Sequence, residues 1–215
     1  MGIMNTLLLA AFLLCPMIHQ QPEPWDTLND LNVHVVAGAN MGSKVADPAP
    51  EFGGKLEYLL IHPIAVRVSG HYSFSNIGSF DIPSGSRESF DLSFEALAYR
   101  GRDDYFLYLG AGLVRTFNNY TPDRFDDYTF NNEQYDSLMR VGNLTGVDLD
   151  DGWGYRIIAG GRYKERISLE MGIQRVWADF GFHLDNPDPR MPYVDIYRDK
   201  IHATAWLTIG YIFAL

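Results

Sequence analysis

The sequence contains one cysteine, Cys15, so no disulfide can form within the chain and stability must come from burial and hydrogen bonding. A long apolar run is also absent. A membrane-spanning helix needs about 20 consecutive apolar residues, and the one candidate run, Leu7 to Ile18, is shorter than that. Although 47% of the residues are hydrophobic, the mean hydropathy is only −0.13. These values exclude a helical membrane protein.

Positive charge is scarce, because 17 Lys and Arg residues face 27 Asp and Glu residues and the formal net charge is −10. This balance argues against a nucleic-acid partner, which would require a basic surface. Most of the acidic excess lies in residues 118–151 and 178–199. Clustered carboxylates suit divalent cations such as Ca²⁺ or Mg²⁺, but solvated acidic loops are the simpler interpretation. We therefore predict no metal site and no cofactor, and keep divalent cations as candidate partners of these loops.

The apolar run near the N-terminus precedes a polar stretch that begins at Gln20. This arrangement is typical of a secretory signal. We predict a signal peptide over residues 1–21 and a single domain over residues 22–215. Removal of this signal would leave a mature chain without cysteine.

The stretch from Lys200 to Leu215 alternates strictly, with Ile201, Leu207, Ile209 and Tyr211 among the apolar residues of one face. Such a period of two is typical of a strand with two chemically different faces. Seven further stretches alternate in the same way. The eight predicted strands are Leu31–Asn40, Phe52–Ile61, Pro63–Phe74, Ser89–Tyr99, Tyr105–Phe117, Trp153–Lys164, Ile167–Trp177 and Lys200–Leu215. An apolar terminal strand needs a partner, and pairing it with the first strand closes a barrel.

The predicted connections alternate between short ones, at residues 62–63, 101–104 and 164–166, and long ones, at residues 41–51, 75–88, 118–151 and 178–199. Outer-membrane barrels have short turns on the periplasmic side and long loops outside. The predicted fold class is therefore all-β, an eight-stranded antiparallel transmembrane up-and-down β-barrel.

The two strand faces predict which side points outward. One face is apolar and often aromatic, whereas the other carries four cationic and four anionic residues, namely Lys55, Arg67, Arg156, Arg162, Glu57, Asp91, Glu95 and Glu170. A lipid-facing surface disfavours charge, since Lys or Arg at the bilayer midplane costs about 2–4 kcal/mol. We therefore expect the eight ions in the lumen, as a paired network that plugs the barrel. Inward glycines would make room for Tyr108 and Trp206. Arg115 falls on the apolar face, which predicts either a position beyond the lipid or a β-bulge.

Several short segments resemble the small outer-membrane β-barrel family that includes the OmpA transmembrane domain, OmpX and OmpW. They are Gly53–Tyr58, Tyr108–Leu113, Ala159–Tyr163, Ile167–Gly172 and the end of the chain from Leu207 to Leu215. The resemblance implies the outer membrane of a Gram-negative bacterium, with membrane lipid and the barrel-assembly machinery as partners. Members usually end in an aromatic residue, whereas this chain ends in Leu215.

The sequence favours a non-enzymatic structural or surface-interaction protein, because no lipid-facing His–Ser–acid set is visible. The longest loop carries aromatic residues that could bind a surface partner or anchor the loop to the barrel rim, and Asn131 to Val141 could form a short helix there. These residues are Tyr120, Phe125, Tyr128, Phe130 and Tyr135. An OmpW-like conduit for small hydrophobic molecules is the alternative; its inward lining residues would be Leu59, Leu97, Phe106, Ile158 and Trp206. A lipid-modifying outer-membrane enzyme is a weaker third hypothesis.

Overall fold

The structure of the protein is a computed structural model. It describes residues 31–42, 47–79, 82–102, 104–123, 143–164, 166–185 and 193–215. The predicted signal peptide, the predicted short helix at residues 131–141 and the loop aromatics Phe125, Tyr128, Phe130 and Tyr135 lie outside these ranges. Nowhere in the described ranges is there a helix with the length and apolar character needed to span a membrane.

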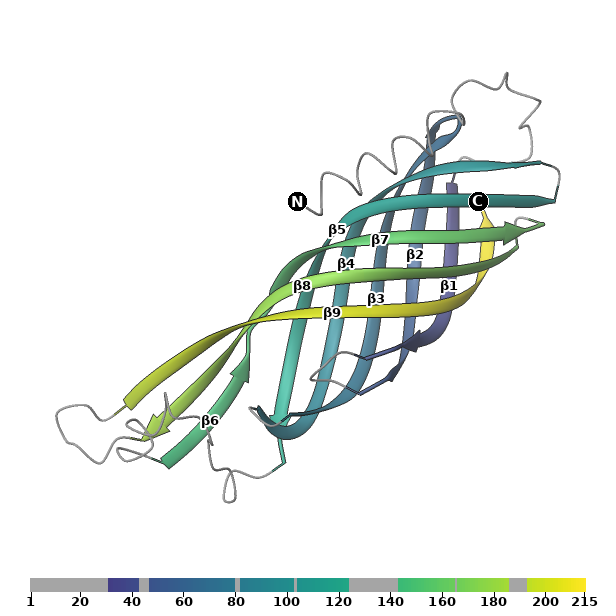
Figure 1. Ribbon diagram of the computed structural model, residues 1–215. Helices are drawn as coiled ribbons and strands as arrows, with labels where there is room; N and C mark the ends of the chain where they lie inside the picture. The colour runs from purple at the N-terminus through teal and green to yellow at the C-terminus, as the bar shows by residue number, and fades with distance from the viewer. Residues whose placement is uncertain are drawn as a thin grey trace.

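Strands make up nearly all of the described chain, and they close into a ring (Figure 1). The strands are β1 (Leu31–Asn40), β2 (Ala49–Ile61), β3 (Ile64–Ser79), β4 (Ile82–Arg102), β5 (Tyr105–Pro122), β6 (Asn143–Leu149), β7 (Gly152–Tyr163), β8 (Ile167–Asp185) and β9 (Tyr193–Ala214). The ring runs β1-β2-β3-β4-β5-β7-β8-β9, and antiparallel pairing of β9 with β1 closes it. The predicted eight-stranded antiparallel barrel is confirmed.

Strand β6 was not predicted, and it does not widen the ring. It pairs with the end of β8 that lies beyond the pairing of β8 with β7, so that Leu149 lies opposite Phe180 and Trp153 opposite Trp177. Both β6 and β7 are antiparallel to β8 and pair with successive parts of it, so they occupy the same position in the sheet beside β8. Residues 150–151 separate the two strands. Strands β6, β8 and β9 thus project together beyond the ring, as Figure 1 shows.

The predicted alternation of short and long connections is only partly correct. The connections at residues 62–63, 103–104 and 164–166 are short and lie at one end, the turn end, which also holds residue 31 and Leu215. At the other end, the loop end, β3 and β4 continue to Ser79 and Ile82, so residues 75–79 and 82–88 are paired strand and not loop. Residues 178–185 and 193–199 likewise continue the β8–β9 ladder. Paired backbone extends past the point at which the apolar alternation weakens.

Opposite faces of each strand differ sharply in exposure. On β4, Phe94 is 59% exposed whereas its neighbour Glu95 is 0% exposed. Large apolar side chains therefore cover the outside, and the ionic face is enclosed. Arg115 keeps the outward parity of Leu113, and the β4–β5 register is continuous past it. The bulge considered for Arg115 is therefore wrong.

Glycines on the inner face admit two large aromatic side chains. A Cβ atom at Gly160 would lie 2.3 Å from the ring of Tyr108, and one at Gly172 would lie 2.3 Å from the ring of Trp206. Any larger residue at either position would displace the aromatic ring. Small inner residues thus give room to large ones, as expected in a narrow eight-stranded barrel.

Candidate functional site in the barrel interior

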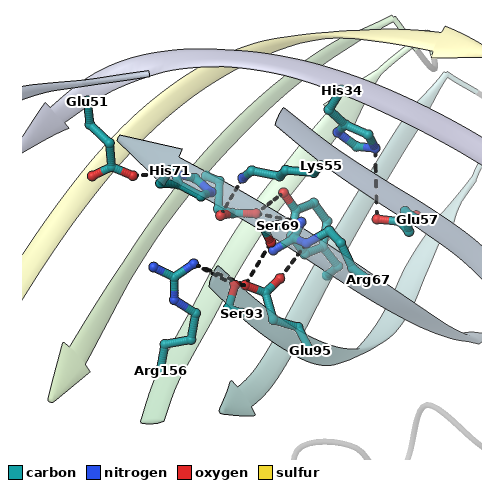
Figure 2. Close-up of polar contacts among 12 residues, drawn as sticks. His34, Glu51, Lys55, Glu57, Arg67, Ser69, His71, Ser93, Glu95 and Arg156 are labelled. Carbon is teal, nitrogen blue, oxygen red and sulfur yellow. Dashed lines mark hydrogen bonds and ion pairs between the residues drawn. The ribbon is translucent and has the colours of Figure 1, made fainter. Parts of the chain in front are cut away.

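The interior of the ring holds a network of hydrogen-bonded ions, and five strands supply the eight charged side chains predicted to face the lumen (Figure 2). The side chains of all eight charged residues assigned to the lumen from the sequence point inward, seven of them buried and Asp91 partly buried. They come from β2 (Lys55, Glu57), β3 (Arg67), β4 (Asp91, Glu95), β7 (Arg156, Arg162) and β8 (Glu170).

Glu95 accepts four hydrogen bonds. Its carboxylate receives Arg67 Nε at 2.5 Å and Arg156 Nη1 at 3.1 Å. The hydroxyls of Ser69 and Ser93 donate to the same group at 3.0 and 2.7 Å. Two cations and two hydroxyls therefore replace the water that this fully buried carboxylate gives up, which is the condition for holding a charge in a protein interior.

Arg67 joins Glu95 to a second carboxylate. Its Nη1 lies 2.7 Å from Glu170 Oε2, and Lys55 Nζ lies 2.7 Å from the other oxygen of Glu170. The Tyr108 hydroxyl donates to Glu170 at 2.8 Å. Because Arg67 is on β3, Glu95 on β4 and Glu170 on β8, these contacts brace walls of the barrel that are far apart in the sequence.

A second centre forms around Glu57 nearer the turn end. Its carboxylate binds Arg162 and accepts a hydrogen bond from the Tyr99 hydroxyl at 2.7 Å. The Arg162 guanidinium also lies over the Tyr99 ring, 4.8 Å from its centroid, and contacts His34 Nε2 at 3.3 Å. Arg162 thus joins β7 to β1, β2 and β4.

Arg156 extends the network toward the loop end. Its Nη2 donates to Gln174 Oε1 at 2.6 Å and lies 3.9 Å from Asp91. Gln174 and the Thr116 hydroxyl donate to Asp91 at 2.7 and 2.6 Å. The guanidinium stacks 4.5 Å from the centroid of the Trp206 ring, so this cation contacts an aromatic face as well as acceptors.

Two inward charges were missed in the sequence. Glu51 is buried and binds His71 Nδ1, and Arg87 is buried and donates to Asn118 Oδ1 at 2.9 and 2.7 Å. Both lie just before the predicted starts of their strands. Continuing each alternation by one more pair of residues would have found them. With them, the described interior carries five cationic and five anionic side chains.

The turn end of the lumen is filled by apolar side chains. The buried cluster consists of Ala65, Leu97, Tyr99, Phe106, Tyr108, Ile158 and Trp206, with Leu59 packed against it. It contains four of the five residues named as lining of a hydrophobic conduit, and the fifth, Leu59, packs against it. In the structure these residues pack against one another and against the two network tyrosines.

Of the loop aromatics named from the sequence, the structure describes Tyr120. It is buried, near the loop end of β5. Burial, together with the nearby Asp123 carboxylate, raises the pKa of its hydroxyl to about 12. In the same acidic region, Asp148 contacts His183 Nε2 at 2.6 Å. Across the described residues, no three His, Cys, Asp or Glu side chains are grouped to hold a metal ion.

No family model matches the chain, and no curated protein matches it. Among solved structures, it is similar to the outer membrane protein OprG from Pseudomonas aeruginosa, at 13% identity and a TM-score of 0.54 over 88% of this chain and 98% of that one. It is also similar, at 15% identity and a TM-score of 0.39 over 86% of this chain and 98% of the other, to the N-terminal β-barrel domain of OprF from the same organism. The match to OprG supports the fold of a small outer-membrane β-barrel.

Proposed function

We propose that the protein is an outer-membrane β-barrel of a Gram-negative bacterium with a non-enzymatic structural or surface-interaction role. The observation that carries the proposal is the inverted polarity of the barrel. The outer wall is covered by exposed apolar side chains such as Phe94, Leu107 and Leu113. The charged side chains of the network, among them Arg67, Glu95 and Arg156, are enclosed in the lumen. In water this arrangement would expose an apolar belt around the whole molecule, and a bilayer is the solvent that suits it.

A structural role, rather than a wide aqueous pore, is supported by the way the lumen is filled. The ionic network occupies the middle of the described interior, and the apolar cluster around Leu97, Phe106 and Ile158 occupies its turn end. A porin-type channel would instead need a continuous wet path between these side chains. A surface-interaction role is supported by the projecting β6, β8 and β9 ladder, which would carry residues 143–149, 180–185 and 193–198 away from the membrane.

The non-enzymatic part of the proposal is supported by the surroundings of the interior histidines. His71 is paired with Glu51, as a catalytic dyad would be, but its Nε2 atom is buried and has no hydrogen-bond partner among the described residues. His34 contacts Arg162 and Glu57. A general base needs the group that it deprotonates within reach, and these two rings are aimed into the packed lumen.

Cell fractionation tests the location and electrophoresis tests the closed barrel. We expect the protein in the outer-membrane fraction, with gel migration that changes on heating, as a folded barrel should show. Recovery in the aqueous phase would contradict the membrane location.

Planar-bilayer recordings would then test the filled lumen, for which we expect no steady conductance. A pull-down with the folded protein, compared with a variant shortened within residues 124–142, would test the surface role.

The conduit hypothesis keeps one structural observation in its favour. An apolar groove of about 450 Å³ lies on the wall at the β1–β9 seam, and its lining includes Val35, Ala37, Phe52, Ile209 and Tyr211. Four of these five residues, Val35, Phe52, Ile209 and Tyr211, are large apolar side chains exposed on the outer wall. A small hydrophobic molecule could bind there from the lipid. Binding of a hydrophobic dye that Ala37→Leu abolishes would support this second function, and its absence would leave the structural role alone.

A further inference from the structure

Two arginines interrupt the apolar outer wall of the barrel. Arg115 on β5 and Arg175 on β8 both have outward parity, between buried neighbours such as Thr116 and Gln174. A lipid-facing arginine costs about 2–4 kcal/mol at the bilayer midplane but only about 0–1 kcal/mol near the interface. Their positions are therefore expected to mark the edge of the hydrocarbon region.

Strand length supports that placement. Arg175 lies eight residues above Ile167, the outward residue at the turn end of β8, and Arg115 lies ten residues above Tyr105 on β5. At about 3.3 Å per residue and a tilt of about 35–45°, these separations correspond to heights of roughly 20 and 25 Å. The apolar band of such barrels is about 25 Å tall. Arg115 therefore lies at the loop-end boundary of the band, and Arg175 lies about 5 Å below that boundary.

The two arginines border one aromatic patch. In the register, Trp153 lies opposite both Arg115 and Trp177, and Tyr155 lies opposite Arg175. The Arg115 guanidinium lies 5.1 Å from the Trp153 ring centroid, and that of Arg175 lies 5.6 Å from the Trp177 centroid. The Tyr155 and Trp177 rings are 5.7 Å apart. We call these five residues the boundary patch. Aromatic rings are common at this level of a membrane, and here they also hold the two cations in place.

The acidic partners of these cations are few. Arg115 makes one contact with Asp151, at 3.3 Å, and both side chains are partly exposed. Arg175 has no carboxylate within 4.0 Å in the part of the chain that the structure describes. The Arg115 guanidinium also lies 5.6 Å from the Phe117 ring centroid. Guanidinium groups bind phosphate with two parallel hydrogen bonds from the edge of the planar group, and stacking of rings on its faces leaves that edge able to donate.

We propose that the boundary patch binds the phosphate groups of a phosphorylated glycolipid, the lipopolysaccharide class of the outer leaflet. The proposal rests on the proposed outer-membrane location, which places the loop end in that leaflet. Sugar rings of the glycolipid would stack on the exposed faces of Trp153 and Trp177, while the two arginines receive phosphate. Acyl chains would lie against the apolar wall below.

The test uses the refolded full barrel in detergent micelles that contain purified bisphosphorylated lipid A, with bound lipid counted by native mass spectrometry. The variant is Arg115→Gln with Arg175→Gln. The control is Arg100→Gln, which removes an outward arginine at the turn end of β4. We expect affinity to fall about fivefold for each patch arginine, hence roughly 30-fold in the double variant, with Arg100→Gln unchanged. Double substitution with lysine should restore part of the loss, because charge returns without the planar fork.

Two comparisons can overturn the proposal. Equal binding of lipid A by the wild type and the double glutamine variant would remove the arginines from the site. Equal wild-type binding of lipid A, dephosphorylated lipid A and phosphatidylglycerol would show a general lipid surface instead. Heat-modifiable migration of each variant verifies folding. Because these titrations use purified protein, their outcome does not depend on whether the protein resides in the outer membrane of the cell. Cell fractionation tests that location separately.

Discussion

Replacing Glu95 with leucine should destabilise the barrel strongly. The change removes the acceptor of two buried arginines, Arg67 and Arg156, at 2.5 and 3.1 Å. Removing one partner of a buried ion pair typically costs about 3–5 kcal/mol, since the remaining charge stays buried. Arg67 keeps Glu170 as a second partner, at 2.7 Å, so the variant removes only part of the negative charge that compensates Arg67. At about 2–4 °C per kcal/mol for a chain of this size, the midpoint should fall by roughly 6–20 °C.

The midpoint can be read from heat-modifiable gel migration in detergent, at fixed heating time because barrel unfolding is often irreversible. Phe94→Leu is the matched control: it lies one residue away on β4, faces outward, and should move the midpoint little. Glu95→Gln should lie between the two, because it keeps an acceptor for Ser69 and Ser93 but not the charge. An unchanged or higher midpoint for Glu95→Leu would refute the view that these charges stabilise one another.

Three further outcomes are expected. Tyr99→Phe leaves the Glu57 carboxylate without a 2.7 Å hydrogen bond and should cost about 1–3 kcal/mol, measured as a lower gel-shift midpoint. Gly112→Ala should abolish assembly, because the new Cβ would lie 2.3 Å from a backbone oxygen of β4, whereas Gly54→Ala, with 3.6 Å of space, should yield normal amounts of folded barrel in the membrane fraction. Leu109→Arg places a cation in the middle of the apolar wall and should lower folded yield through a cost of about 2–4 kcal/mol; normal yield would argue against lipid contact there.

The ring of eight strands could be predicted because alternation is a local signal that the sequence displays directly. Strand ends were harder to predict. Before Ser89 on β4 the alternation is lost, and beyond Trp177 on β8 it changes phase, so that Phe180, Phe182 and Leu184 have the opposite parity to Ile167–Ile173, yet the backbone ladder continues. Outside a bilayer both faces of a hairpin can be polar, so pairing persists without the pattern. Strand β6 was missed for the same reason, and residues 150–151 hide its continuity with β7.

Alternation also indicates which residues face the lumen, but not which of them pair. Strand tilt brings together residues that are distant in the sequence, such as Lys55 and Glu170 or Arg162 and Glu57. These contacts depend on the stagger of the closed ring, which no single strand contains. Arg115 illustrates the opposite case. The alternation along β5 predicts correctly that Arg115 faces outward. A bulge was a hypothesis only because a charge on the outward face was unexpected.

The ionic network does not connect all strands of the barrel wall. Residues 31–40 of β1 and 203–214 of β9 contain no formally charged side chain, so the ionic contacts connect β2, β3, β4, β7 and β8 across the lumen. On β9, Thr204 Oγ1, Trp206 Nε1 and Thr208 Oγ1 are buried without a hydrogen-bond partner among the described residues. The β1–β9 seam is therefore held by its backbone ladder and by apolar contact, whereas His34 connects β1 to Arg162 of β7.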